Sequence, residues 1–217
     1  VRHRCQRQEA RRRRARAPDG STWIVEANRG ILLHLSAEGT ALTTVADGGG
    51  AYGTIGRLRG LAVAPDGRVY VLDTNARRVL VYSAEGERLF EFGRRGATGG
   101  AFEAPQALAV DAAGQVYLLD AEFGRVLRYE ADGTFVSSWE HPGYQPGQIS
   151  AAGSLLLGPD DTILLGERYR GVINVFTRGG EARRTVAVPA ACGRGNTGIT
   201  GAPALLPGGD FVVIDAC

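Results

Sequence analysis

The sequence predicts an all-β protein, built as a β-propeller of four-stranded antiparallel blades. Two observations predict this fold. Residues 60–93 contain four short apolar runs separated by turn signals, and the same pattern returns after 47 residues at Ala107 and again at Ser154. A fixed period in this range is typical of stacked supersecondary units. We therefore expect one blade for every 47 residues.

Single residue types keep the same period. Glycine recurs at the turn before each fourth strand, at Gly39, Gly86, Gly133 and Gly180. Acidic residues recur at the end of each second strand, with one inserted residue before the last, at Glu26, Asp73, Asp120, Glu167 and Asp215. Because only 23 of the 217 residues are acidic, a chance run of five has odds on the order of one in ten thousand. The register of the repeat is therefore well defined.

The first 17 residues contain eight arginines and one glutamate, which leaves a net charge of −5 on the other 200 residues. Adjacent arginines repel one another, so we expect residues 1–17 to be a disordered tail or linker. The alternative is an anchor for nucleic acid or an anionic membrane. Residues 13–17 stand where the second blade has its innermost strand. Since buried unpaired charges are costly, we expect the first blade to lack that strand.

The blades are predicted at residues 18–53, 54–97, 98–145 and 146–191, with a partial blade at 192–217. In the second blade, Pro65 and Gly67 suit a type I turn between the first two strands. The next two strands, residues 69–73 and 77–82, are nearly continuous apolar runs, as expected for sheets covered on both faces. The fourth strand mixes charges, which suits an outer rim.

The linker GRRGATGGAFEAP and the strands LAVD, GQVYLLD and GRVLRY that follow it resemble the NHL repeat of six-bladed β-propellers. The resemblance covers residues 18–217 and is strongest in the second and third repeats. It departs from the pattern in the fourth, at Gly166 and Glu167. Six blades of this length need roughly 280 residues. We therefore expect the sequence to be a piece of a longer chain that supplies the missing blades.

The repeated acids have two interpretations. They could form a carboxylate-lined mouth that holds a divalent cation, which is the only cofactor that the sequence brings into consideration. Alternatively, each carboxylate accepts N–H groups at the corner after its strand and fixes the blade. We favour the second interpretation, because a residue repeated in every blade usually serves the blade.

Residues that vary between blades are better candidates for ligand binding. Loops on a rigid scaffold commonly carry function, and the alternative is that these are ordinary solvated loop residues. The candidates lie two positions after each acid and in the loop before the fourth blade: Asn28, Asn75, Glu122, His141, Tyr144, Gln145 and Tyr169.

Catalytic and metal-binding patterns are weak. His3, His34 and His141 are far apart in the sequence without metal-ligand spacing, and no nucleophile-elbow motif is present. Cys192 and Cys217 fall on the same face of the predicted fifth blade, so we hypothesise a disulfide and an oxidising, extracytoplasmic or secreted location. The alternative is two free thiols in a cytoplasmic protein.

The sequence thus favours a non-enzymatic recognition or scaffolding module. Its ligand, a protein, peptide or small molecule, would bind the loop face of the propeller. The alternative is a hydrolase or lyase with a metal on the propeller axis. The acidic body argues against nucleic acid as the ligand of the propeller itself, and no apolar run approaches the roughly 18 residues of a membrane span. NHL-like domains include RNA-binding, protein-binding and bacterial extracytoplasmic sensor proteins, so the resemblance leaves the partner open.

Overall fold

A computed structural model describes residues 12–26, 30–46, 58–188, 204–205 and 211–212. These residues form four antiparallel four-stranded sheets and one two-stranded sheet. The first blade contains β1 (Arg12–Arg16), β2 (Thr22–Glu26), β3 (Ile31–Leu35) and β4 (Ala41–Ala46). The second contains β5 (Leu58–Val63), β6 (Val69–Asp73), β7 (Arg78–Tyr82) and β8 (Arg88–Phe92). The third contains β9 (Pro105–Val110), β10 (Val116–Asp120), β11 (Arg125–Tyr129) and β12 (Phe135–Glu140). The fourth contains β13 (Ala152–Gly158), β14 (Thr162–Glu167), β15 (Val172–Thr177) and β16 (Ala182–Ala187), and the short sheet contains β17 (Ala204–Leu205) and β18 (Phe211–Val212).

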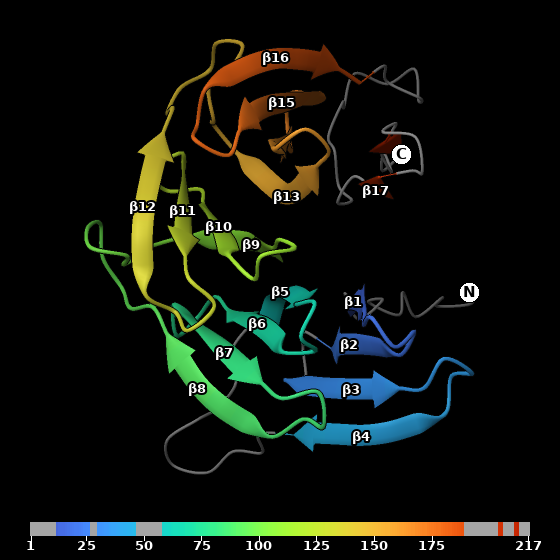
Figure 1. Ribbon diagram of the computed structural model, residues 1–217. Helices are drawn as coiled ribbons and strands as arrows, with labels where there is room; N and C mark the ends of the chain where they lie inside the picture. The colour runs from blue at the N-terminus through green and yellow to red at the C-terminus, as the bar shows by residue number, and fades with distance from the viewer. Residues whose placement is uncertain (1–11, 27–29, 47–57, 189–203, 206–210, 213–217) are drawn as a thin grey trace, which may run out of the picture.

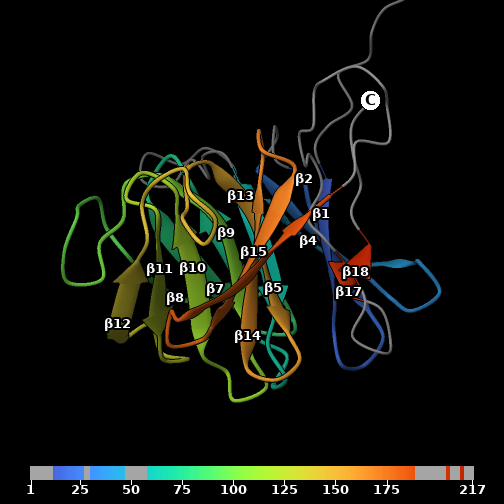
Figure 2. The ribbon, with the colours of Figure 1, turned by 90° about the horizontal axis from the view of Figure 1, so that it is seen from above.

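The four blades surround a common centre, with β5, β9 and β13 near it and β8, β12 and β16 at the rim (Figure 1). Each blade pairs its strands in chain order. Consecutive antiparallel strands therefore place the first and third turns of every blade at one end of the strands. We call this end the turn face. The second turns of the second, third and fourth blades and the two loops that join these blades lie at the other end, which we call the loop face (Figure 2). The predicted β-propeller is confirmed.

The second strands of the second and third blades are buried on both sides, as their apolar runs predict. All five residues of β6 are buried, and so are all five of β10. Because side chains alternate along a strand, Val69 and Val71 pack towards the first blade, whereas Tyr70 and Leu72 pack towards the third. The second and third sheets are thus each held between two neighbours. In the described part of the chain, no helix is long and apolar enough to cross a membrane.

The first blade differs from the expectation, because its innermost strand is present. Arg12–Arg16 forms β1 and pairs with β2 along its full length, with Ala15 opposite Trp23. The physical reason is the period of two in a strand. Ala15 is half-buried and Ala17 packs against the core between the first two blades, whereas Arg14 and Arg16 are exposed. The arginine-rich sequence therefore forms an edge strand without burying those two charges, and the blade begins at residue 12 rather than 18.

The loops between blades repeat the same local structure. Arg95 bridges Phe102 in the loop before the third blade, and Pro142 bridges Ile149 in the loop before the fourth. Phe102 is fully buried in the core between the second and third blades. Its ring lies so close to Gly93 that a β-carbon there would overlap it, and Gly93 has a positive φ of 91°. The aromatic residue of the linker motif therefore anchors the loop in the core.

Three buried tyrosines are expected to make the folded protein less stable at alkaline pH. Burial raises the pKa of Tyr70, Tyr117 and Tyr129 above the ordinary value of 10.0. Their stabilising contribution is complete below the unfolded pKa and is lost as pH rises through the folded values. Tyrosine ionisation should therefore leave the urea concentration at the unfolding midpoint unchanged up to about pH 9. Above about pH 10 the midpoint should fall. A midpoint that rises from pH 10 to 11 would contradict this.

Candidate functional site

Three of the repeated acids are buried and accept hydrogen bonds from backbone N–H groups. Asp73, Asp120 and Glu167 are all 0% exposed. Asp73 Oδ1 accepts hydrogen bonds from the N–H groups of Asn75 and Ala76 at the corner after its strand, both at 3.1 Å. The sequence predicted this corner contact. Glu26 is half-buried, and Asp215 lies outside the described residues.

The other two acids reach further than the predicted corner. Asp120 accepts hydrogen bonds from the N–H groups of Glu103 and Ala104 at 3.2 and 2.9 Å, in the loop that enters its own blade. Glu167 does the same for the loop before the fourth blade, where its Oε2 accepts from Ala151 N at 2.8 Å. Charge-assisted bonds to backbone N–H groups are strong. These carboxylates therefore fasten each loop to the second strand of the blade that follows it.

Asp120 also pairs with a buried cation. The Arg125 side chain is 8% exposed, and its Nη2 lies 3.1 Å from Asp120 Oδ2. The same nitrogen donates to Ala101 O at 2.8 Å, and the guanidinium lies 4.7 Å from the ring centre of Phe123. The oxygens of this acid are thus engaged with protein donors. Within the described ranges, no group of three or more His, Cys, Asp or Glu side chains is arranged to hold a metal ion.

The predicted binding residues that the structure describes are five exposed residues and one half-buried histidine. Asn75, Glu122, Tyr144, Gln145 and Tyr169 are exposed on the loop face. Asn28 lies outside the described residues, as do Cys192 and Cys217 with their hypothesised disulfide. His141 is half-buried, and its Nε2 lies 2.7 Å from Gly180 O in the fourth blade. Its ring stacks on Phe176 with centres 5.5 Å apart. His141 therefore connects the loop before the fourth blade to the third strand of that blade and the turn after it.

Tyr144 and Tyr169 stand out among the exposed residues. They are 79% and 75% exposed, the highest fractions among the exposed large hydrophobic side chains of the described residues. Tyr144 belongs to the loop before the fourth blade, and Tyr169 to the corner after β14. The loop and the corner meet where Arg170 Nη1 lies 3.5 Å from Gln145 O. Two aromatic rings are thus presented from adjoining segments, the loop that enters the fourth blade and a corner of that blade.

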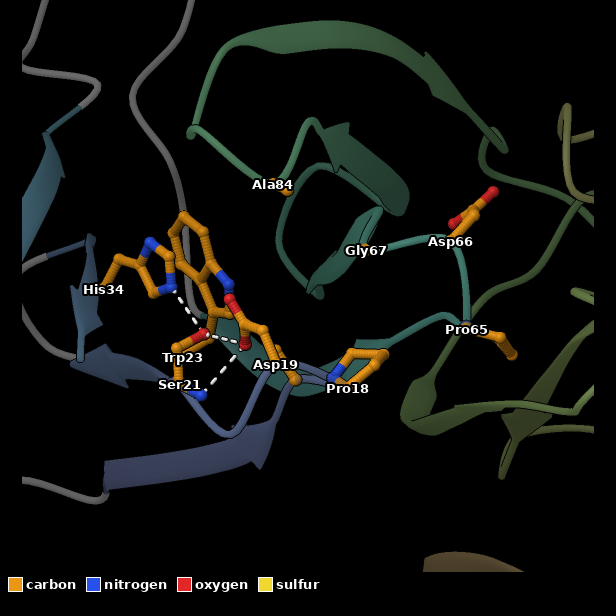
Figure 3. A pocket seen from close by; sticks show the side chains of 10 residues that line it. Pro18, Asp19, Ser21, Trp23, His34, Pro65, Asp66, Gly67 and Ala84 are labelled. Atoms are coloured by element: carbon orange, nitrogen blue, oxygen red, sulfur yellow. Dashed lines mark hydrogen bonds between the residues drawn. The ribbon is translucent and has the colours of Figure 1, made fainter. Parts of the chain in front are cut away.

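A pocket of about 220 Å³ lies on the opposite, turn face, between the first and second blades. Figure 3 shows His34 directed at Ser21, and Ser21 at Asp19. His34 Nε2 lies 2.8 Å from Ser21 Oγ, which donates to Asp19 Oδ1 at 2.7 Å. The His34 ring stacks on Trp23 with centres 4.0 Å apart. The pocket lining is Ala17, Pro18, Asp19, Ser21, Trp23, His34, Pro65, Asp66, Gly67 and Ala84.

The order of these groups determines their chemistry. In a Ser-His-Asp triad the histidine stands between the other two and removes the serine proton. Here Ser21 stands between, and its hydroxyl proton is donated to Asp19, so His34 Nε2 must be the donor to Ser21. The hydrogen bonds from Ser21 also lower the pKa of Asp19. The arrangement fixes a turn and does not activate a nucleophile.

Sequence reasoning singled out His34 without its partners. The signal that would have found them is the strand register, since His34 lies directly opposite Trp23 on the neighbouring strand. Ser21 and Asp19 belong to the turn that precedes that strand. A prediction of which residues face each other, in addition to the strand limits, would have brought these side chains together.

Comparisons with known proteins agree with this architecture. Residues 54–150 match a family described as six-bladed β-propellers. Comparison with curated protein sequences gave no match. Among solved structures, an inactive variant of virginiamycin B lyase from Staphylococcus aureus with quinupristin is similar at a TM-score of 0.65 and 16% identity. That similarity covers 94% of this chain and 69% of the lyase.

Two other structures extend the comparison. Hydrazine synthase from Kuenenia stuttgartiensis has a TM-score of 0.60 at 15% identity, over 80% of this chain and 48% of that one. A protein of unknown function from Bacteroides caccae has a TM-score of 0.57 at 14% identity, over 80% and 59%. The chain thus spans about half the length of the synthase. Identities this low establish the fold alone, and the chain is a β-propeller whose second and third blades match the six-bladed type.

Proposed function

We propose that this chain is a non-enzymatic recognition module of the NHL type that binds a protein or peptide on its loop face. The exposure of Tyr144 and Tyr169 on the fourth blade is the observation that carries the proposal. Tyrosine is enriched in binding interfaces because its ring supplies a large contact area and its hydroxyl a hydrogen bond. Solvent-exposed side chains this large have no role in the core.

The segments that present the two tyrosines are held to the fourth blade by hydrogen bonds. His141 links the loop of Tyr144 to the fourth blade, and Glu167 fastens the end of that loop to β14. Tyr169 follows Glu167 by two residues at the same corner. Side chains that need little reorganisation lose less conformational entropy on binding. The placement of exposed rings on fastened segments therefore favours a binding surface.

The repeated acids support a binding module over the metal-dependent alternative. A cation on the axis needs several free oxygen ligands, whereas Asp120 and Glu167 use theirs on backbone N–H groups. The linker residue Phe102 packs in a core between blades, and the repeated acids Asp120 and Glu167 bond to loop N–H groups. The family resemblance and the binding role are thus consistent with each other.

A peptide-display selection against the chain would test the proposal. We expect the selected peptides to bind the Tyr144→Ala/Tyr169→Ala variant at least tenfold more weakly, because loss of an aromatic anchor costs more than about 1 kcal/mol. The matched control is Leu89→Ala, which removes an exposed side chain from the rim. Fluorescence anisotropy would measure the affinities. Equal binding to native chain and double variant would refute this surface.

A further inference from the structure

The interfaces between blades share two corresponding positions at their turn-face end. One lies just before a second strand, where the 47-residue repeat relates Ser21 to Arg68. The other lies in the third turn of the following blade, where the repeat relates Ala84 to Ala131 and Arg178. The side chains at these positions differ in size and charge, so the interfaces differ in what lies between their turns.

A guanidinium group lies at this end of the interface between the second and third blades. Arg68 Nε and Nη2 lie 2.7 and 2.6 Å from Asp66 Oδ2, in the first turn of the second blade. Arg68 Nη1 donates to Ala131 O at 3.0 Å, and the Tyr70 hydroxyl donates to the same oxygen at 2.8 Å. The arginine therefore joins a first-turn carboxylate to a backbone carbonyl of the next blade.

A second guanidinium group lies at the same end of the interface between the third and fourth blades. Arg178 Nη1 lies 2.5 Å from Asp111 Oδ2, which again belongs to a first turn. The Arg178 Cζ atom lies 5.5 Å from the ring centre of Tyr117. Arg178 belongs to the later blade of its interface, whereas Arg68 belongs to the earlier one. Both interfaces nevertheless place a guanidinium group against a first-turn carboxylate.

The interface between the first and second blades has the carboxylate but neither arginine. Asp19 occupies the repeat position of Asp66, and its Oδ1 accepts hydrogen bonds from the N–H group and the hydroxyl of Ser21. Among the contacts of the described residues, Asp19 Oδ2 has no hydrogen-bond or ion-pair partner, and Ala84 O accepts no hydrogen bond. Both residues line the pocket of about 220 Å³ (Figure 3). Since one water needs only roughly 10–15 Å³, the pocket has room for a larger group.

The surroundings of the pocket suit an alkyl chain that ends in a cation. The hydrogen bonds from Ser21 lower the pKa of Asp19 below its ordinary value, so this carboxylate is ionised at neutral pH. Pro18, Trp23 and Pro65 also line the pocket. Their apolar atoms can cover the methylene groups of a long cationic side chain.

Two arginines of the chain lie near the pocket without lining it. Arg16 Nη2 is 3.7 Å from the point where a β-carbon of Gly20 would lie. Arg68 is held by Asp66. Within the described part of the chain, no arginine forms an ion pair with Asp19, so this carboxylate is available to a cation from outside.

We propose that the pocket between the first and second blades is a binding site for the guanidinium group of a ligand, as carried by an arginine side chain. The bound group lies as Arg68 lies one blade further on. Asp19 Oδ2 accepts from two of its N–H groups and Ala84 O accepts from a third. A lysine ammonium group lacks this planar fork, so arginine is preferred. The site is on the turn face, opposite the Tyr144 and Tyr169 surface, and it does not depend on the proposed peptide binding.

Nα-Acetylarginine amide is the probe for this site, and two-dimensional NMR of the full chain would follow the indole signal of Trp23. Trp139 is the other tryptophan of the chain and lies in β12, so its signal is an internal reference. We expect a saturable shift of the Trp23 signal alone. Nα-Acetylcitrulline amide has the same shape without the charge, and it should bind about fivefold more weakly because it loses the ion pair.

Asp19→Asn removes the charge and keeps an acceptor oxygen for Ser21, so the turn is retained. The variant should bind the arginine probe about fivefold more weakly. The matched control is Asp132→Asn, which makes the same change at an exposed carboxylate on the turn face of the third blade and should leave the affinity unchanged. The Tyr144→Ala/Tyr169→Ala variant should also bind the probe like the native chain, and this separates the pocket from the loop-face surface.

Ala84→Arg tests the site without altering Asp19. Ala84 is exposed, and Arg178 occupies the corresponding turn position in the fourth blade, so the turn accepts an arginine. The introduced guanidinium group should enter the pocket and abolish probe binding without lowering the melting temperature. The matched control is Ala131→Arg, which adds the same charge at the corresponding turn of the third blade and should retain probe binding.

Free L-arginine and a capped Gly-Arg-Gly peptide distinguish an amino-acid ligand from a peptide ligand by their relative affinities, and saturable binding of either supports the site. The proposal is overturned if the arginine probe gives no saturable shift of the Trp23 signal. Equal binding of the arginine and citrulline probes would also overturn it, as would equal affinities of Asp19→Asn and Asp132→Asn. Undiminished binding to Ala84→Arg would place the probe elsewhere.

Discussion

Replacing Asp120 with asparagine is expected to destabilise the fold by about 3–5 kcal/mol, because it leaves a buried cation without its counter-ion. The Arg125 side chain is 8% exposed and lies 3.1 Å from Asp120 Oδ2. Asparagine keeps the shape of the side chain but replaces one of its two acceptor oxygens by an NH2 group. The expected loss therefore includes a hydrogen bond to the Glu103 or Ala104 N–H group as well as the charge. Urea denaturation followed by circular dichroism would measure the free energy of unfolding.

A matched control is the Arg95→Ala variant, which removes an ion pair that is largely exposed. The Arg95 side chain is 74% exposed and its Nε lies 3.0 Å from Glu103 Oε2, so the expected cost is below about 1 kcal/mol. In addition, Arg125→Leu should cost less in the Asp120→Asn background than in the native chain, since the two residues are coupled. Additive costs would show that Asp120 does not act through Arg125.

Replacing Phe102 with alanine is expected to cost about 3–5 kcal/mol, the range for a fully buried aromatic side chain. Phe102 is 0% exposed and packs in the core between the second and third blades. Its backbone bonds to Arg94 O and from Gly96 N do not involve the ring. The decrease in the free energy of unfolding therefore reports the burial of the Phe102 ring and not the hydrogen bonds of the loop backbone. The same denaturation measurement applies.

Two variants make the Phe102 prediction specific. Phe102→Ile copies Ile149, which bridges at the same repeat position in the next loop, and we expect it to cost less than the alanine change. Leu89→Ala at the rim, where the side chain is 48% exposed, should cost less than about 1 kcal/mol. If Phe102→Ala also cost less than this, the loop would not be held by its aromatic residue.

The repeat made most of the fold predictable from the sequence. Apolar runs such as residues 69–73 and 116–120 became the second strands of their blades, because only strands covered on both faces lack polar alternation. The strand β1 could not be predicted in the same way. The arginines of β1 predict a solvated segment and not an inner strand. The strand can pair with β2 because Ala15 and Ala17 alternate with arginines that stay exposed.

The candidate sites were less predictable. Periodicity identifies residues that are identical between blades, such as Asp73 and Asp120, and these are buried and bonded to backbone N–H groups. Ser21 and Arg68 share a repeat position but differ in type, so no repeated motif marks the pocket beside Ser21. The contact of Arg68 with Ala131 joins residues 63 positions apart. Such contacts depend on how far one blade is rotated from the next, which the strand pattern does not specify.

The sandwiching of the second and third sheets between their neighbours has a consequence for how the chain folds. Contacts within a blade join residues close in sequence, and each core described between blades joins two consecutive blades. Folding units of this kind can form in succession and grow by addition of the next unit. During synthesis the second blade can therefore fold onto the first before the fourth has been made, so that nascent intermediates are shorter versions of the same architecture.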